Sequence, residues 1–303
     1  MRNKMILMKK IFKIAICSAF VLLPFGQVFA QNQSKHEISV TGGFGLSSLD
    51  FSIDNADRSD KTGGLIGIGY SYFINNNFSI NTGMEVTFYS SDFSMKSFTD
   101  SYKANDMEDD FLFNTSVTDY KEEQSTTFIN IPIMGQYQMP VIGEHQFYAA
   151  LGAKIGIPVT ATYKTAGATY ETSGTYDDIG TISDVPGLGF DKFNGKRVKE
   201  DLDFKVAYML ALEAGMKWAL SSSFSLYTGA YFDYGLNDIR DKKNEKFLVY
   251  EPPYTGTKAE NFKLNSMLHS QYTDGSGNTK SISDKVIPFA LGVKVKLAFS
   301  VSQ

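Results

Sequence analysis

The chain has 303 residues, a formal net charge of −4 and 43% hydrophobic residues, with 24 Phe and 17 Tyr but only three His and one Cys. This length is enough for one sizeable barrel or sandwich domain. A mean hydropathy of −0.18, without an internal apolar run of about 18 residues, excludes a polytopic helical membrane protein. The mild acidity also gives no electrostatic footprint for binding nucleic acid.

Residues 1–30 have the pattern of a secretory signal peptide. Lysines precede a short apolar core over 11–25, and the segment ends on the small residue Ala30. A membrane anchor is the alternative, which a stretch this short and interrupted by proline does not favour. Because the one cysteine, Cys17, lies inside the signal, we expect no disulfide in the exported domain of residues 31–303.

From residue 37 onward, apolar residues recur with a period of two, which predicts β-strands. In 204–218 every even position is apolar, from Phe204 to Trp218, whereas the odd positions are mostly polar, charged or small. Eight segments share this pattern, at 37–49, 64–73, 78–90, 126–138, 146–162, 204–218, 223–235 and 286–302.

The strand lengths and their connectors together indicate a membrane barrel. The segments run about 10 to 17 residues, longer than the usual strands of soluble sheets. Short turns at 75–77, 140–145 and 220–222 alternate with long polar connectors at 50–63, 91–125, 163–203 and 236–285. Short periplasmic turns and long extracellular loops are typical of outer-membrane proteins. We therefore predict an all-β fold, an eight-stranded antiparallel transmembrane barrel in the bacterial outer membrane.

Aromatic residues gather at both ends of the apolar strand face, as expected at the two membrane interfaces. The periplasmic belt consists of Tyr72, Phe78, Tyr137, Phe147, Trp218, Phe224 and Phe299. The belt at the loop end consists of Phe44, Phe88, Phe204, Tyr234 and Phe289.

The charges indicate which face points into the barrel. The apolar face carries no charged residue, whereas the other face carries Glu85, Lys154, Lys205, Glu213, Lys217, Asp233, Lys294 and Lys296. A water-soluble, lipocalin-like barrel would have the opposite polarity, with an apolar interior. We therefore expect the charges to face the lumen and the apolar side chains to face lipid.

Charges at equal depth in the lumen are expected to pair, Glu85 with Lys154 and Glu213 with Lys294, Lys296 or both. Buried pairs of this kind form a connected, hydrogen-bonded plug, because a lone buried charge is costly. Glycines on the same face leave room for the long lysine and tyrosine side chains. A narrow conditional channel is the alternative to a plug.

The sequence offers little for catalysis or cofactor binding. His36 precedes the first strand, His145 lies in a periplasmic turn, and only His269 lies in an outer loop, beside Ser270. We therefore predict a protein without enzymatic activity, cofactor or metal site. The second long connector contains a cluster of acidic residues, at Asp106, Glu108, Asp109, Asp110, Asp119, Glu122 and Glu123. Such a cluster could hold a divalent cation, but a solvated loop is the favoured interpretation.

The last long connector mixes basic and aromatic residues, a combination frequent at recognition surfaces. Its candidate binding residues are Arg240, Lys242, Lys243, Phe247, Tyr250 and Tyr254. Such a surface would contact an acidic sugar, lipopolysaccharide or an extracellular protein. A mobile hydrophilic cap is the equally weighted alternative, because long connections are usually either functional or disordered.

The predicted hairpin 127–154 contains Ile131-Pro132 in its first strand, and Tyr148 and Gly152 in the Tyr-x-x-x-Gly spacing in its second. With these residues it resembles the central hairpin of the PorT-like outer-membrane β-barrel proteins. The resemblance implies a barrel without an appended domain, and some members of that family take part in secretion. Pro132 cannot donate to the strand ladder, so we expect a bulge or local opening there.

These observations predict a barrel with a side-chain-filled lumen that acts through its extracellular loops as a binding or envelope-structural protein. Its expected partners are outer-membrane lipid, lipopolysaccharide, and an extracellular protein or glycan, with the oligomeric state left open. The alternatives are a narrow conditional channel and an accessory subunit of an outer-membrane secretion complex.

Overall fold

The structure is a computed structural model that describes residues 35–142, 145–241, 245–252 and 262–301. The predicted signal peptide lies outside these residues. The described regular structure is β except for one short 3-10 helix, η1 (Pro186–Leu188). Within the described ranges, no helix is long and apolar enough to cross a membrane.

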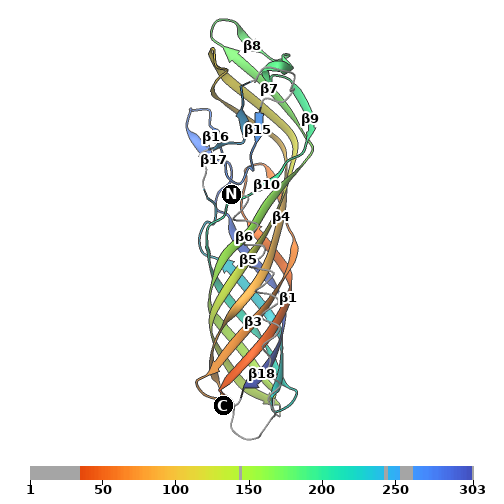
Figure 1. Cartoon of the computed structure of the whole chain (residues 1–303), viewed down its shortest axis with the longest axis vertical. Helices are drawn as coiled ribbons and strands as arrows, with labels where there is room; N and C mark the ends of the chain where they lie inside the picture. Colours follow the sequence, from red (N-terminus) through yellow and green to blue (C-terminus); the bar gives the residue numbers. More distant parts are fainter. Residues whose placement is uncertain (1–34, 143–144, 242–244, 253–261, 302–303) are drawn as a thin grey trace, which may run out of the picture. The chain divides into compact units, whose positions relative to one another are not determined.

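Eight long strands form a ring in which each strand pairs antiparallel with two neighbours (Figure 1). They are β1 (His36–Asp50), β3 (Thr62–Phe73), β4 (Phe78–Asn105), β5 (Asp110–Ile142), β6 (His145–Ala166), β11 (Ala207–Ala219), β12 (Phe224–Gly235) and β18 (Ile287–Val301). They follow one another around the ring in this order, and β18 pairs with β1. The predicted eight-stranded antiparallel transmembrane barrel is thus confirmed.

Side chains along each ring strand alternate between the outside and the lumen. On the outside, Val40, Leu151 and Val293 are 57 to 64% exposed, as expected for a surface that faces lipid. Their sequence neighbours on the other face, such as Ala150 and Lys294, are buried. The apolar face therefore points outward and the charged face points into the lumen.

Pro132 interrupts the pairing between β4 and β5. The ladder runs to Ile133 and resumes at Asn130, and the two positions between them have no paired partner on β4. Proline has no N–H to donate, which accounts for this local opening. The β5–β6 hairpin has two register shifts elsewhere, one between Thr127 and Phe128 and one between Pro140 and Ile142.

Three ring strands, β4, β5 and β6, continue above the ring as an extended sheet. Its further strands are β2 (Ala56–Asp60), β7 (Ala168–Tyr176), β8 (Gly180–Ile182), β9 (Lys192–Lys196) and β10 (Lys199–Asp201). The segment 91–125, predicted to be a long loop, is instead a β-hairpin with a short turn at 106–109. The period of two continues through this segment, with Phe93 and Met95 pointing inward, but its outer face is polar and so the strand signal is weaker.

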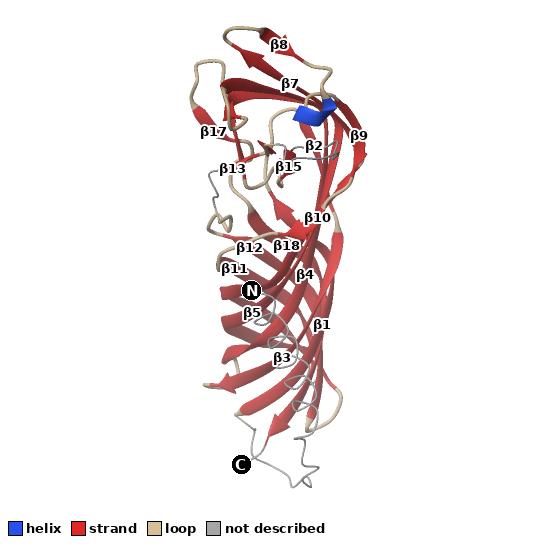
Figure 2. Cartoon of the chain, turned by 45° about the horizontal axis from the view of Figure 1, so that its top comes forward, coloured by secondary structure: helices blue, strands red, loops and turns tan. Residues whose placement is uncertain are grey.

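The last long connector folds back against this sheet. It contains β13 (Glu245–Lys246), β14 (Leu248–Tyr250), β15 (Phe262–Leu264), β16 (Ser270–Thr273) and β17 (Thr279–Ser281). β16 contacts β4, and Figure 2 labels β13, β15 and β17 in the upper part of the molecule. We refer to the described parts of 50–61, 91–125, 163–206 and 236–286 as the extracellular assembly.

An aromatic core holds the extracellular assembly together. The ring centroid of Phe111 on β5 is 5.0 Å from that of Tyr176 on β7 and 5.0 Å from that of Tyr250 on β14. Phe113 and Phe247 are fully buried in the same core. Truncating a buried aromatic residue of this kind typically costs about 3–5 kcal/mol. The described parts of the long connectors are thus packed structure with a hydrophobic core of their own.

Candidate functional site: the lumen and the extracellular assembly

Five charged side chains form a connected series across the lumen, which we call the lumen network. Lys154 Nζ of β6 lies 2.7 Å from Glu85 Oε2 of β4 and 2.8 Å from Asp233 Oδ2 of β12. Lys294 Nζ of β18 lies 2.6 Å from Glu85 Oε1 and also pairs with Glu213 of β11. The signs therefore alternate from Asp233 to Glu213, and each member is at most 8% exposed. The network ties together five strands of the ring.

The two pairs expected at equal depth, Glu85 with Lys154 and Glu213 with Lys294, are both formed. Lys296, the other partner considered for Glu213, lies over the ring of Tyr227, 4.2 Å from its centroid. A cation over an aromatic face is attracted by the ring quadrupole.

A second ion pair lies nearer to the periplasmic end of the lumen. Lys217 Nζ is 2.6 Å from Glu37 Oε1, and Tyr227 Oη donates a hydrogen bond of 2.7 Å to Glu37 Oε2. Glu37 was not among the predicted lumen charges, although its place in the alternation of the first strand, next to the outward-facing Ile38, marks it as facing the lumen.

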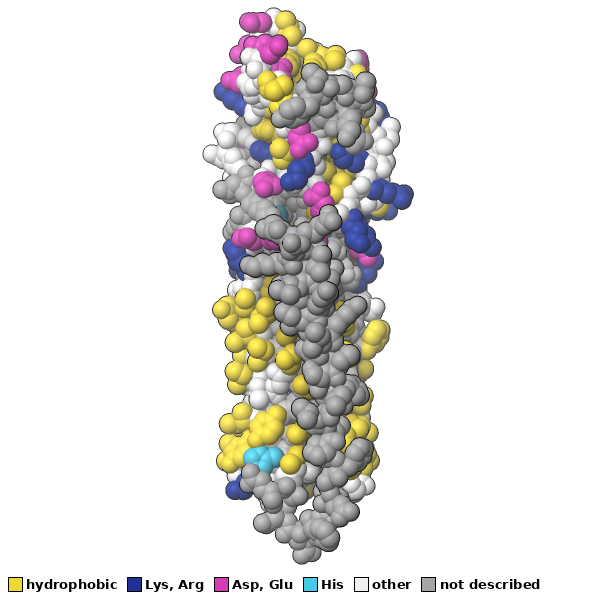
Figure 3. Space-filling model, viewed as in Figure 1, with side chains coloured by type: hydrophobic (Ala, Val, Ile, Leu, Met, Phe, Trp, Pro, Cys, Tyr) yellow, Lys and Arg dark blue, Asp and Glu magenta, His cyan; other side chains and the backbone are white. Residues whose placement is uncertain are grey.

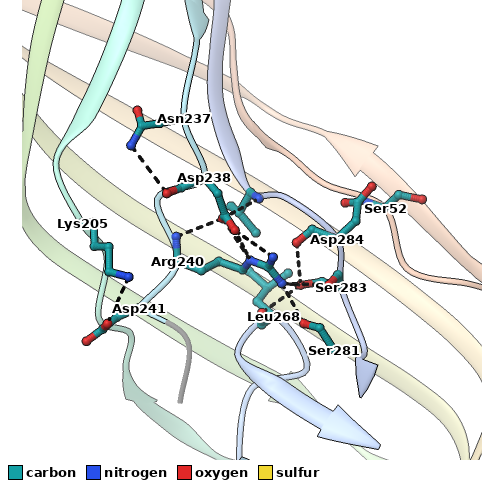
Figure 4. A network of polar contacts seen from close by, with 11 residues as sticks. Ser52, Lys205, Asn237, Asp238, Arg240, Asp241, Leu268, Ser281, Ser283 and Asp284 are labelled. Atoms are coloured by element: carbon teal, nitrogen blue, oxygen red, sulfur yellow. Dashed lines mark hydrogen bonds and ion pairs between the residues drawn. The ribbon is translucent and has the colours of Figure 1, made fainter. Parts of the chain in front are cut away.

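Lys205 does not belong to the lumen network, so its prediction as a lumen charge was wrong. β11 begins at Ala207, so Lys205 lies above the ring, where its Nζ is 3.5 Å from Asp241 Oδ1 (Figure 4). The alternating pattern extends a few residues beyond the hydrogen-bonded strand, and this extension caused the error. The described lumen then contains four charges of each sign. The lysines are Lys154, Lys217, Lys294 and Lys296, and the carboxylates are Glu37, Glu85, Glu213 and Asp233.

Tyrosine side chains fill the lumen between these charges, and glycine makes room for them. Tyr148, Tyr227 and Tyr231 are each 1% exposed. A Cβ added to Gly229 would lie 2.7 Å from Tyr148 Oη and 2.3 Å from the Ala214 carbonyl oxygen. A larger residue at this position would therefore clash with both the tyrosine and the neighbouring strand.

Aromatic rings mark the periplasmic edge of the lipid-facing surface. Phe78 packs against Tyr137 and Phe224 against Phe299, with ring centroids 4.9 and 4.6 Å apart. The remaining members of the predicted belt are exposed or half-buried, namely Tyr72, Phe147 and Trp218.

The upper belt is placed as expected except for one residue. Phe44, Phe88 and Tyr234 are exposed on the outer face of the ring. Phe204 instead precedes β11 and packs against His269 of the last connector, with ring centroids 5.5 Å apart. Its inclusion among the lipid-facing residues was therefore wrong, for the same reason as that of Lys205.

Three of the six candidate binding residues in the last connector are buried. Phe247 and Tyr250 belong to the aromatic core and are at most 7% exposed. Arg240 is 4% exposed and donates hydrogen bonds to the side chains of Asp238, Ser281 and Ser283 (Figure 4). These three side chains stabilise the extracellular assembly and present no contact surface, contrary to the prediction. The other candidates, Lys242, Lys243 and Tyr254, lie outside the described residues.

The Arg240 contacts attach the end of β12 to the segment that leads into β18. Burial alone would raise the pKa of Asp238, but hydrogen bonds from the Arg240 guanidinium and from the amides of Val286 and Arg240 hold it below its usual range. The Asp238 carboxylate is therefore charged at neutral pH and supports a bidentate contact with arginine.

Glu122 anchors the last connector to β5 from the inside. It is 1% exposed, and its carboxylate accepts hydrogen bonds from Tyr120 Oη, Gln124 Nε2, Ser266 Oγ and the Met267 amide. Burial raises the pKa of Glu122, and these hydrogen bonds offset only part of the effect. The prediction of Glu122 in a solvated acidic loop was therefore wrong, because the inward direction of its side chain becomes visible only once the hairpin is known.

The remaining acidic residues of this connector are spread along the hairpin. Asp106 Oδ1 accepts hydrogen bonds from the amides of Glu108 and Asp109, which shapes the turn. Across the described ranges, no three His, Cys, Asp or Glu side chains are placed to hold a metal ion.

Each histidine contacts an aromatic ring. His36 Nδ1 lies 2.6 Å from Tyr70 Oη, and the ring centroids of His145 and Trp218 are 5.3 Å apart. His269 packs against Phe204, as described above.

Comparison with known proteins agrees with this geometry. Residues 29–241 match the family described as the outer membrane protein beta-barrel domain. The chain belongs to this family. The protein is accordingly located in the bacterial outer membrane, with its short turns on the periplasmic side. A search of curated proteins finds no match.

Solved structures of outer-membrane proteins are similar to the chain at low sequence identity. Neisserial surface protein A is 11% identical, with 89% of this chain and 100% of that chain covered and a TM-score of 0.34. OprG from Pseudomonas aeruginosa is 11% identical, with 90% and 100% covered and a TM-score of 0.36. The attachment invasion locus protein Ail of Yersinia pestis, solved with the heparin analogue sucrose octasulfate, is 14% identical, with 86% and 99% covered and a TM-score of 0.22.

Proposed function

We propose that this protein is a plugged outer-membrane barrel that acts through its extracellular assembly, as a binding or structural protein of the cell envelope. The observation that carries this proposal is the aromatic core shared by the second, third and last long connectors. A folded assembly of this size exceeds what is needed to close hairpins, and rigid extracellular surfaces are suited to recognition.

The lumen supports a plug over the alternative of a narrow channel. Lys154 is 1% exposed and paired on both sides, and Tyr148 and Tyr227 are packed together with ring centroids 5.2 Å apart. An eight-stranded barrel is just wide enough for side chains to fill it. Opening a path would require separating buried ion pairs, each costly to break.

The end of the assembly farthest from the ring is the proposed contact surface. Its two turns are joined, because Tyr176 Oη at the end of β7 donates a hydrogen bond of 2.7 Å to Asp106 Oδ2. Met107 and Ile179 on these turns are 63 and 69% exposed. Acidic residues surround them, at Asp106, Glu108, Asp109, Asp177 and Asp178. This combination fits a protein partner with a basic surface and an apolar pocket.

Photo-crosslinking in intact cells tests the contact surface. A photo-reactive residue placed at Met107 or Ile179 should capture a partner protein. The same residue at Lys192, which is 60% exposed on the edge strand β9, serves as the control. Equal capture, or no capture, at all three positions would contradict a contact surface at this end.

Planar-bilayer recording tests the plug. The purified protein should give no steady openings, and steady openings would instead support the narrow channel.

The assignment to the PorT-like group within the family rests on Ile131-Pro132 and on Tyr148 with Gly152. Co-purification with export components in mild detergent would favour the accessory role in secretion that this group implies.

A further inference from the structure

A pocket of about 640 Å³ lies on the outward face of the extended sheet. Strand pairing explains its lining. Five successive strands, β2, β4, β5, β6 and β10, contribute one side chain each to a continuous row on this face, namely Ser59, Asp92, Glu123, Lys164 and Lys199. Lys121 and Arg197 extend the lining beside this row.

The basic half of the pocket has an unbalanced charge. Lys164 and Lys199 stand directly opposite each other on paired strands, an arrangement that destabilises a sheet unless an anion lies between them. Lys121 and Arg197 are exposed nearby. In the part of the chain that the structure describes, none of these four side chains has an ion pair or a hydrogen bond to another side chain.

The acidic half is better compensated. Its exposed and half-buried carboxylates are Asp57, Asp92 and Glu123, and among the described residues Asp92 has an ion pair, with Lys61 at 2.9 Å. Glu123 lies between Asp92 and Lys164 in the row, so a carboxylate stands beside the cations. The pocket thus offers cations that would bind a phosphate, next to carboxylates that would accept hydrogen bonds from sugar hydroxyl groups. This pairing of functions matches a phosphorylated sugar better than a simple anion.

The height of the pocket above the membrane indicates where such a ligand comes from. On β4, Asp92 of the row lies four residues above Phe88 of the upper aromatic belt. Four residues of a tilted strand correspond to about 10 Å along the barrel axis. The headgroup region of a bilayer extends roughly 5–8 Å beyond the hydrocarbon, and lysine side chains reach several ångströms further. Figure 3 shows Lys and Arg side chains just above the hydrophobic band.

We propose that this pocket binds the phosphorylated sugar headgroup of a glycolipid in the outer leaflet. Lys164, Lys199 and Arg197 hold the phosphate, while the acyl chains lie along the apolar outer face of the barrel below. This contact with the apolar face favours a lipid over a free sugar phosphate, since a soluble ligand would gain nothing from it. The proposal concerns a different surface from the distal end and holds whether or not that end binds a protein.

The test compares two variants that lose the same charge. The pocket variant carries Lys121→Gln, Lys164→Gln, Arg197→Gln and Lys199→Gln. The control variant carries glutamine at four exposed lysines elsewhere on the assembly, Lys96, Lys103, Lys192 and Lys280. Full-length protein in detergent is titrated with mixed micelles that contain bisphosphorylated lipid A, and the retained lipid is counted by native mass spectrometry. A shift in gel mobility between boiled and unboiled samples confirms that each variant is folded.

The pocket variant should bind lipid A about tenfold more weakly than the parent, because four weak ion pairs are lost together. The control variant should bind like the parent, and dephosphorylated lipid A should bind the parent as weakly as lipid A binds the pocket variant. Equal loss in both variants would overturn the proposal, since it would show a general charge effect. Equal affinity of the parent for the phosphorylated disaccharide without acyl chains would overturn the lipid as the source. If the fourfold variant does not fold, Lys164→Gln with Lys199→Gln repeats the test with two control lysines.

Discussion

The lumen network makes an unexpected prediction about its central residue. Glu85 touches two lysines, yet its removal leaves two complete pairs, Asp233 with Lys154 and Lys294 with Glu213. A glutamine at this position still offers an oxygen to a lysine. Glu85→Gln should therefore cost about 1–2 kcal/mol of unfolding free energy.

Lys154→Met should lower the unfolding free energy far more than Glu85→Gln does, although the lysine and methionine side chains are similar in size. Asp233 is 0% exposed, its only ion-pair partner among the described residues is Lys154, and its Oδ1 atom has no hydrogen-bond partner there. The substitution would leave a buried carboxylate without a cation, at a cost of about 3–5 kcal/mol. Adding Asp233→Asn should recover a large part of this loss, because the two residues are coupled.

Urea unfolding of the protein in lipid vesicles measures both effects. Trp218, the one tryptophan of the chain, lies in the periplasmic belt and reports through its fluorescence when the barrel leaves the bilayer. A cost for Glu85→Gln equal to or above that for Lys154→Met would refute the alternating series. Additive effects of Lys154→Met and Asp233→Asn would refute the direct pair.

Three further predictions follow from the faces and the core. Leu212→Arg, on the lipid face well below the upper belt, should lower the unfolding free energy by about 2–4 kcal/mol in the same urea assay. Ala211→Ser, on the lumen face, should lower it by less than about 1 kcal/mol. Equal costs would mean that the faces are inverted. Phe247→Ala should make the last connector sensitive to protease, because it lowers the local unfolding free energy by about 3–5 kcal/mol. The ring should keep its heat-modifiable gel mobility. Unchanged protease resistance would contradict the shared core. The pKa of Glu122 is raised in the folded state, so its contribution to stability is fully present below its unfolded pKa of about 4.3 and is lost as the pH rises through its folded pKa. Glu122→Gln should therefore flatten the pH dependence of protease resistance between acidic and neutral pH. An unchanged slope would show that another group is responsible.

The ring was largely predictable because its signal is local. A strand between lipid and a polar lumen must alternate at every residue, so Val293 and Lys294 report their own directions without any knowledge of the partner strands. The pairing of Glu85 with Lys154 was also within reach, since the depth of a residue can be counted from the aromatic belt.

The extracellular assembly was not predictable in the same way. Above the membrane, the outer face of β4 and β5 meets water, so the alternation loses its apolar half and the hairpin resembles a polar loop. The inward direction of Glu122 and the burial of Phe247 depend on contacts between segments more than 100 residues apart, such as the hydrogen bond from Ser266 to Glu122 and the packing of Phe247 against Tyr120. The burial of Arg240 depends on Ser281 and Ser283, about 40 residues further along the chain. Phe247 and Tyr250 were predicted as binding residues because composition alone does not distinguish an aromatic residue that recognises a partner from one that fills a core.

The shared aromatic core has a consequence for the order of biogenesis. Phe111 of the second connector meets Tyr250 of the last one, and Tyr170 of the third connector meets Phe262 of the last one, so these contacts exist only in the finished assembly. The core cannot be completed until the polypeptide beyond residue 262 has crossed the outer membrane, after most ring strands have been made. Contacts so distant along the chain also form slowly, because the entropy of closing a long loop is lost before the contacts can stabilise the fold. We therefore expect the last connector to join the core on the cell surface as a late step. A defect confined to this core should yield an inserted barrel whose exterior never matures, a state separable from failure of insertion itself.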